Sequence, residues 1–242
     1  MLELLQENLK KTYAIRRKAI ELQDQIFEKE GFTIINGHPY WVHDKKAYYI
    51  FMLINITGRF IQNPHILKEI TEAVVRIVDF SNVDKILTLE AMGLHVGTAL
   101  SLKTNKPLTI AGKVKYRDEI TNWEPPYQMF IEKKTGYSAS RLYINDIIPH
   151  ERILLIDSII STGGSFVATI KKLQEYSVEI VDAIAVIEKA DYDGVERVKR
   201  ETGVDVKTLV KVNIRDVVER DNTLLTYNDV EINPDVLQQI SA

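Results

Sequence analysis

Residues 153–165 hold the residue types in this chain that are best suited to chemistry. The stretch has the sequence ILLIDSIISTGGS, an apolar run followed by Asp157 and then by a loop with hydroxyl residues and two glycines. We expect a buried strand that ends at Asp157 and a helix that starts at about Gly164. Backbone N–H groups at a helix N-terminus, with glycines that permit close approach, form a site for a phosphate. Asp157 can accept hydrogen bonds from sugar hydroxyls, so this loop offers a phosphate site beside a ribose site.

This segment resembles the signature of the type I phosphoribosyltransferases, which bind phosphoribosyl pyrophosphate (PRPP). That signature has four apolar residues, two acidic residues, two apolar residues and then Ser/Thr/Ala-Thr-Gly-Gly-Ser/Thr. The chain departs from it at Ser158, where the family usually has Asp or Glu. The resemblance implies that ribose hydroxyls bind Asp157, with Ser158 beside it. It implies that the 5′-phosphate binds at Ser161, Thr162, Gly163, Gly164 and Ser165.

Three further segments resemble purine members of that family. Residues 87–93 (LTLEAMG) resemble the pyrophosphate loop of xanthine and archaeal purine phosphoribosyltransferases, and Lys113 matches a basic position after the next strand. Residues 134–138 and 142–145 resemble the flexible loop and its return strand in archaeal members. Residues 186–189 (VIEK), followed by Gly194, resemble the segment that meets the base, so Lys189 is expected to bind the purine. The resemblance assigns pyrophosphate to Glu90, Ala91, Met92, Gly93 and Lys113, and catalysis to Asp157, Glu90 and Lys113.

The resemblance implies a purine-salvage enzyme, a pentosyltransferase that joins a purine base to the sugar phosphate of PRPP. The products are a nucleoside 5′-monophosphate and pyrophosphate. Mg²⁺ is expected as a cofactor carried mainly by PRPP, with no direct metal ligand in the protein, and the enzyme is expected to be a homodimer. Oxocarbenium character develops at C1′ as pyrophosphate leaves, which requires positioning, charge neutralisation and exclusion of water.

Two positions bear on the choice between adenine and hypoxanthine, and they point in opposite directions. The Lys189 ammonium, as a donor to a purine O6, favours a 6-oxopurine. Ser161 favours adenine, because some 6-oxopurine enzymes place an Asp there, close to the purine N7. A serine cannot act as such a base near neutral pH. Either a lid carboxylate such as Glu119 or Glu132 assists, or the base reacts without strong help.

Two other functions remain as alternatives. The first is a transcriptional regulator that senses PRPP or purines and has kept the fold without catalysis; Ser158 and the N-terminal sixty residues favour it. The net charge of −3 and the lack of a basic recognition helix argue against it. The second is orotate phosphoribosyltransfer, which is disfavoured because the base-side segment resembles purine enzymes.

The elements that must position these residues follow from apolar runs that alternate with helical patterns. The pattern predicts strands at 86–89, 107–110, 152–156, 181–187 and 207–212. It predicts helices near 64–78, 164–176 and 192–202, and a further helix that begins near Gly93. Continuous apolar strands separated by helices indicate an α/β fold with a mostly parallel sheet and flanking helices. The core should span 63–212, with a polar lid at about 113–140. Residues 1–62 should form a helix and a small hood, and 213–242 a C-terminal extension.

Composition limits the classes that remain. A pI near 6.0 gives no electrostatic footprint for nucleic acid, and the absence of cysteine excludes disulfides and Cys-ligated zinc. The five histidines are scattered, without metal-ligand spacing. The N-terminus lacks the pattern of a secretory signal, and the most apolar stretch, 48–56, is too short to span a bilayer. We therefore expect a cytoplasmic protein.

Overall fold

The structure is a computed structural model. It describes residues 2–6, 31–35, 38–43, 46–48, 64–117, 120–134, 139–212 and 230–241.

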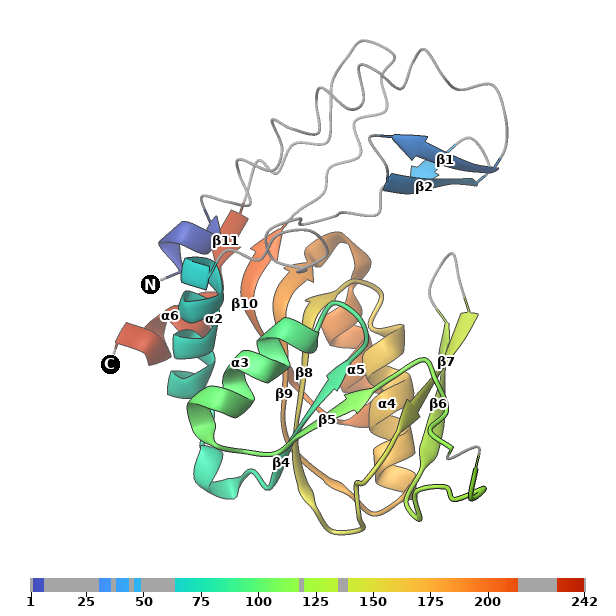
Figure 1. The fold of residues 1–242 in the computed structure, drawn as a ribbon. Helices are drawn as coiled ribbons and strands as arrows, with labels where there is room; N and C mark the ends of the chain where they lie inside the picture. Colours follow the sequence, from blue (N-terminus) through green and yellow to red (C-terminus); the bar gives the residue numbers. More distant parts are fainter. Residues whose placement is uncertain are drawn as a thin grey trace.

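A six-stranded sheet forms the centre of the molecule, and its strand order is β11-β10-β9-β8-β4-β5. All neighbouring strands pair in parallel except β11, which runs antiparallel to β10. This arrangement confirms the predicted α/β fold with a mostly parallel sheet (Figure 1). The strands are β4 (Lys85–Leu89), β5 (Leu108–Ala111), β8 (Arg152–Ile160), β9 (Glu179–Lys189), β10 (Val206–Val212) and β11 (Val230–Ile232).

Helices cover both faces of the sheet, and each face has its own apolar core (Figure 1). Successive residues of a strand point to opposite faces, so Ile86 and Leu154 contribute to one core while Leu87 and Leu155 contribute to the other. The first core is covered by α2 (Pro64–Ile77), α3 (Leu94–Thr104) and α6 (Pro234–Ser241). The second is covered by α4 (Gly164–Glu175) and α5 (Gly194–Thr202). Within the described ranges, no helix combines the length and apolar composition needed to cross a membrane.

The strand that carries Asp157 is longer than predicted. It was expected to end at Asp157, but β8 continues to Ile160 because it pairs with the long strand β9 up to the partners Ile160 and Glu188. Strand β9 likewise extends beyond the predicted 181–187 and ends at Lys189. Asp157 and Ser158 are therefore part of the sheet, and the connecting loop begins at Ser161.

The segment interpreted as a lid leads into a hairpin. The sequence analysis missed its first strand, while its second strand overlaps the return strand implied at 142–145. Strands β6 (Met129–Lys134) and β7 (Ala139–Ile144) pair in an antiparallel register. Met129 and Ile131 are buried in the core beneath α4, whereas Phe130 between them is 47% exposed. This alternation of period two is typical of a half-buried strand. Only these two of the strand's described side chains are part of the core, and the residues around them are mostly polar, so the alternation could not be recognised in the sequence.

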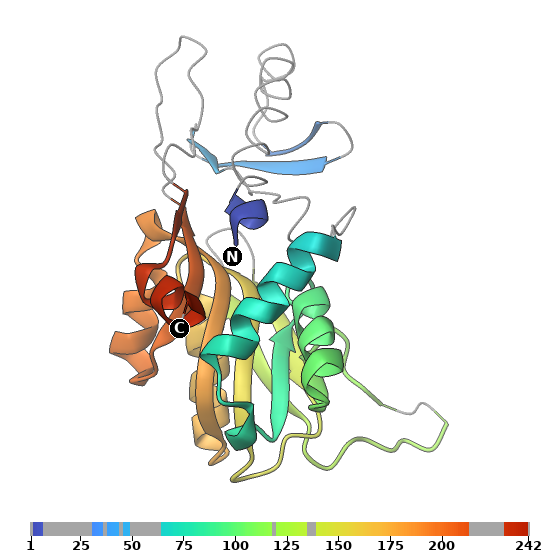
Figure 2. The same cartoon turned by 90° about the vertical axis from the view of Figure 1, so that its left-hand side faces the viewer.

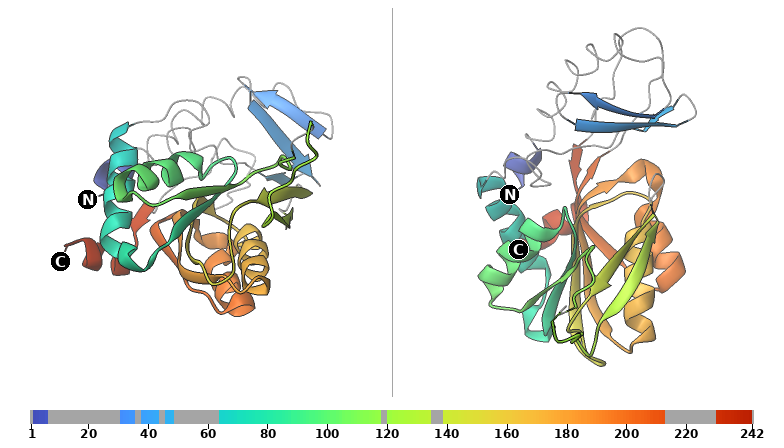
Figure 3. Two further views of the ribbon diagram at one scale, coloured as in Figure 1. Left: turned by 60° about the horizontal axis from the view of Figure 1, so that its bottom comes forward. Right: turned by 45° about the vertical axis from the view of Figure 1, so that its right-hand side comes forward.

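The regions outside the predicted core also contain strands. β1 (Gly31–Ile35), β2 (His38–His43) and β3 (Lys46–Tyr48) form a separate antiparallel sheet. Figures 2 and 3 show it beyond the edge of the main sheet to which the parallel strands point. The predicted C-terminal extension supplies β11 and α6, and α6 is tied to α2 by a hydrogen bond of 2.7 Å from Arg76 Nη1 to the carbonyl oxygen of Ile240.

An ion pair joins two neighbouring strands at the opposite, amino-terminal edge of the sheet. Arg152 at the start of β8 donates from Nη2 and Nε to the two carboxylate oxygens of Asp84, at 2.7 and 3.0 Å. Asp84 directly precedes β4, so the pair joins the beginnings of two neighbouring strands. The hydrogen bonds from the Arg152 side chain lower the pKa of Asp84 from 3.8 to about 2.

Asp84→Asn is expected to lower the free energy of unfolding near neutral pH, and this deficit should shrink in acid. The stabilisation by Asp84 is complete above its unfolded-state pKa of 3.8 and is lost as the pH falls through the folded-state value of about 2. Denaturant titrations of wild type and variant between about pH 7 and about pH 2.5 measure the difference. A deficit that does not change over this range would mean that the ion pair is not the source of the stabilisation.

Candidate functional site

The loop between β8 and α4 has the geometry expected of an anion site. Gly163 occupies the N-cap position of α4 with φ of 71°. This left-handed conformation favours glycine, and glycine offers no side chain that could cap the first N–H groups of the helix. Ser161, Thr162, Gly164 and Ser165 are half-buried. The predicted phosphate residues therefore surround the uncapped N-terminus of a twelve-residue helix.

Asp157 and Ser158 lie in the carboxyl-terminal part of β8, and both are buried. Asp157 is 7% exposed, and its Oδ1 accepts a hydrogen bond of 2.7 Å from the backbone N–H of Ser158. The Ser158 side chain is fully buried, and its Oγ has no hydrogen-bond partner among the described residues. The backbone of Ser158 thus orients the carboxylate of Asp157, while its hydroxyl points into the protein.

The loop after β4 lies beside Asp157. A Cβ atom added at Gly93 would be 3.0 Å from Asp157 Oδ1 and 2.1 Å from Thr88 Oγ1, so a side chain there would displace Thr88. The Thr88 hydroxyl is another buried group without a hydrogen-bond partner in the described part of the chain. The structure therefore places the predicted pyrophosphate loop and the predicted ribose carboxylate at adjoining strand ends.

Glu90 and Lys113 are also brought together, although through the backbone of the lysine. The Lys113 N–H donates to Glu90 Oε2 at 2.6 Å, and the Glu90 N–H donates to the carbonyl oxygen of Ala111 at 3.0 Å. Glu90 thereby joins the ends of β4 and β5, and the exposed side chain of Lys113 begins at the same edge of the sheet. The peptide bond between Glu90 and Ala91 is cis.

Lys189 is the last residue of β9, where it pairs with Val212 of β10. It is half-buried, and a short 3-10 helix, Ala190–Tyr192, follows it. The preceding residue, Glu188, is 8% exposed, accepts a hydrogen bond of 2.9 Å from Thr208 Oγ1 and lies 3.5 Å from the ammonium of Lys211. This satisfied carboxylate fixes the end of the strand that presents Lys189.

Of the two candidate lid carboxylates, the structure describes only Glu132. Glu132 lies on β6, where Arg141 Nη2 donates to it at 3.3 Å, and Glu119 lies outside the described residues. Among the described residues there is also no group of three His, Cys, Asp or Glu side chains that could hold a metal. Mg²⁺ is often held by one or two carboxylates together with substrate phosphates. Asp157 and Glu90 at neighbouring strand ends fit a cation that arrives with a pyrophosphate.

Sequence analysis missed two residues beside this site. Thr88 is a hydroxyl residue inside the otherwise apolar strand predicted at 86–89, and this polar position in an apolar run could have indicated a site residue. Arg197, on α5, donates from Nη1 to the carbonyl oxygen of Thr162 at 3.1 Å. No local pattern could reveal this contact, because it joins residues that are 35 positions apart.

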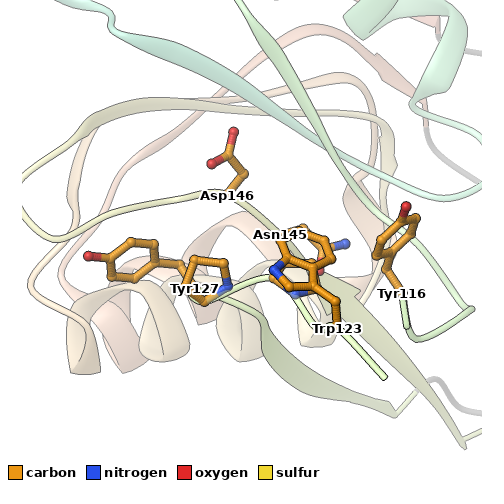
Figure 4. A pocket seen from close by; sticks show the side chains of 7 residues that line it. Tyr116, Trp123, Tyr127, Asn145 and Asp146 are labelled. Carbon is orange, nitrogen blue, oxygen red and sulfur yellow. The ribbon is translucent and has the colours of Figure 1, made fainter. Parts of the chain in front are cut away.

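An open hollow of 420 Å³ lies away from these residues (Figure 4). Its walls come from the segment before β6 and from the turn after β7. The carbonyl oxygen of Asp146 accepts a hydrogen bond from the ammonium of Lys85, which is the first residue of β4. The hollow therefore belongs to the amino-terminal edge of the sheet, opposite the candidate site. Its lining residues are Tyr116, Trp123, Pro125, Pro126, Tyr127, Asn145 and Asp146.

Comparisons with known proteins find a matching family model and similar sequences. A family model described as the phosphoribosyl transferase domain matches residues 57–217. A hypoxanthine/guanine phosphoribosyltransferase of Methanothermus fervidus is 39% identical over 173 residues, which cover 71% of this chain and 87% of that protein. A protein of the same name from Methanobacterium lacus is 39% identical over 192 residues, covering 79% and 94%.

Solved structures share the fold at low sequence identity. The adenine phosphoribosyltransferase of Rhodothermus marinus superposes with a TM-score of 0.55 at 20% identity, covering 81% of this chain and 99% of that one. The adenine phosphoribosyltransferase of Trypanosoma brucei gives a TM-score of 0.57 at 16% identity, with 87% of each chain covered.

Proposed function

Because the chain belongs to the type I phosphoribosyltransferase family, we propose that it transfers the phosphoribosyl group of PRPP to a purine, with hypoxanthine and guanine as the preferred bases. The observation that carries this proposal is the 39% identity to a hypoxanthine/guanine phosphoribosyltransferase over 87% of that relative's length. The likeness to adenine enzymes is below 25% identity and supports the fold alone. Purine salvage in the cytoplasm by a homodimer belongs to the same proposal.

In the proposed reaction the α4 N-terminus binds the 5′-phosphate. The N–H groups of residues 163–165 and the hydroxyls of Ser161, Thr162 and Ser165 donate to the phosphate oxygens, and the helix dipole favours their negative charge. Asp157 accepts from the ribose hydroxyls, while the backbone of Ser158 holds its carboxylate in place. The sugar is thus held at two points, its 5′-phosphate and its hydroxyls, which lowers the entropic part of the barrier.

Pyrophosphate is proposed to leave toward the loop after β4. Backbone N–H groups of Ala91 and Met92 and the Lys113 ammonium neutralise the charge that develops on it. The Gly93 N–H donates to the carbonyl oxygen of Leu89 at 3.3 Å and so holds the loop. Glu90 positions Lys113 by accepting from its N–H group. Mg²⁺ bound to the phosphates of PRPP would supply further charge neutralisation. Lys189 at the end of β9 donates to O6 of the incoming base.

A panel of bases tests the proposal directly. Purified protein is incubated with PRPP, Mg²⁺ and either adenine, hypoxanthine, guanine, xanthine or orotate, and kcat/KM is measured for each base. We expect hypoxanthine and guanine to exceed the others. Turnover of adenine alone would contradict the proposed preference for hypoxanthine and guanine and would agree with the interpretation of Ser161 as favouring adenine. Turnover of orotate alone would contradict a purine substrate. If no base is converted but PRPP binds and a gel shift with DNA is seen, the chain is a regulator.

Lys189→Met is expected to shift the choice of base. An ammonium is only a donor, so it stabilises O6 of hypoxanthine and is repelled by the amino group of adenine. Lys189 is half-buried, so we expect the lower end of the range for a charge-assisted bond, about a 10-fold fall in the ratio of kcat/KM for hypoxanthine to that for adenine. Steady-state kinetics with both bases give this ratio. An unchanged ratio would show that Lys189 does not read position 6 of the purine.

A further inference from the structure

The start of α5 packs directly against the phosphate loop, backbone against backbone. A Cβ atom added at Gly194 would lie 1.9 Å from the carbonyl oxygen of Ser161 and 2.9 Å from the backbone nitrogen of Gly163. Conversely, a Cβ atom added at Gly163 would lie 2.5 Å from the carbonyl oxygen of Gly194. Real Cβ atoms do not approach other atoms so closely, so the two segments can meet in this way only where both residues are glycine.

One turn further along α5, Arg197 forms a hydrogen bond with the same loop. Its Nη1 donates to the carbonyl oxygen of Thr162 at 3.1 Å, and its Nε donates to Glu201 Oε1 at 2.7 Å. Glu201 also accepts from Lys171 of α4 at 3.2 Å. The guanidinium is therefore held by a carboxylate that is itself held by the helix following the loop.

This hydrogen bond determines the direction of a backbone N–H group in the loop. The Thr162–Gly163 peptide is planar, so fixing its C=O also fixes the N–H of Gly163. A loop that binds a phosphate through its N–H groups gains affinity when those groups are already oriented before the ligand arrives. Arg197 is only 39% exposed, and its charged end is directed to the protein backbone.

From these contacts we propose that Arg197 is a positioning residue for PRPP. It acts through the Thr162 carbonyl to hold the phosphate loop in its binding conformation, while Gly194 provides the close approach that places Arg197 there. This inference rests on the proposed function. Because the loop binds the 5′-phosphate in that function, loss of Arg197 should weaken the binding of PRPP and leave the binding of the base unchanged.

The test compares Arg197→Met with Arg200→Met, which removes the same charge from an exposed position on the same helix. We expect Arg197→Met to raise both KM and the calorimetric Kd for Mg²⁺–PRPP about 10-fold, with kcat and KM for the base within about twofold. Arg200→Met should match wild type. Arg197→Lys retains one donor and should recover only part of the affinity, with KM for PRPP about threefold above that of wild type.

The possible results separate the two proposals. If wild type converts no base, the proposed function fails, whatever the variants do. If wild type is active and Arg197→Met keeps its affinity for PRPP, or if only kcat falls, the role of Arg197 is overturned. An equal rise of KM for PRPP in Arg200→Met would also overturn it, since net charge would then be the cause. Should Arg197→Met fail to fold, Arg197→Lys decides, and an unchanged KM for PRPP in that variant contradicts the inference.

Discussion

Gly163→Ala is expected to reduce kcat/KM for PRPP by more than about 100-fold in a protein that still folds. The residue has φ of 71°, a conformation that costs an alanine about 1 kcal/mol. The added Cβ would also lie 2.5 Å from the carbonyl oxygen of Gly194, a backbone atom that cannot rotate away. The loop must therefore shift from α5, and its N–H groups no longer meet the 5′-phosphate. Calorimetry with PRPP and steady-state kinetics measure the loss.

Gly203→Ala is the matched control for this variant. Gly203 follows α5 with φ of 77°, and an added Cβ would meet nothing within 4 Å. The control therefore introduces the same left-handed strain without the clash and away from the loop. We expect it to lower thermal stability while leaving PRPP affinity unchanged. If Gly163→Ala and Gly203→Ala retain the same affinity, the phosphate does not bind at this loop.

The sheet could be predicted from the sequence because each of its central strands is a continuous apolar run. Residues such as Leu154 and Leu155 face opposite sides, and both sides are covered, so apolar residues predominate on both faces of these strands, with Thr88 as an exception. The end of β8 could not be predicted in the same way. Its last residues pair with β9 through Ile160 and Glu188, and this pairing depends on the length of a strand almost twenty residues further along the chain.

The structure brings the predicted segments to one edge of the sheet and adds contacts that the sequence analysis did not predict. Parallel strands bring their carboxyl ends to one edge, so Glu90, Asp157 and Lys189 could be expected near each other from strand positions alone. The contact from Arg197 to Thr162 could not, because it depends on how α5 lies against α4. The burial of the Ser158 side chain likewise follows from the extension of β8 beyond Asp157.

Ser158 is the one departure from the family signature, which has a second acidic residue at this position. Because Ser158 is buried, the substitution Ser158→Asp should not act as a simple repair of that signature. Ser158 is fully buried beside Asp157, with no partner for its hydroxyl among the described residues. A carboxylate introduced there would be buried and next to a like charge, and both effects disfavour its ionised form. We therefore expect Ser158→Asp to lower stability and not to improve the use of PRPP. A gain in kcat/KM for PRPP in this variant would show that the position reaches the ligand.

Asp157→Asn is expected to weaken the use of PRPP by roughly 10- to 150-fold, because a charge-assisted hydrogen bond to ribose is worth about 1.5–3 kcal/mol. The carboxylate is 7% exposed, so bulk water cannot replace the lost acceptor. The change keeps the size of the side chain and the N–H donated by Ser158, so the loss should appear in kcat/KM for PRPP with little change in melting temperature. Asp84→Asn makes the same substitution at the opposite edge of the sheet and should retain wild-type kinetics. If Asp157→Asn also retains them, ribose is not bound by this carboxylate.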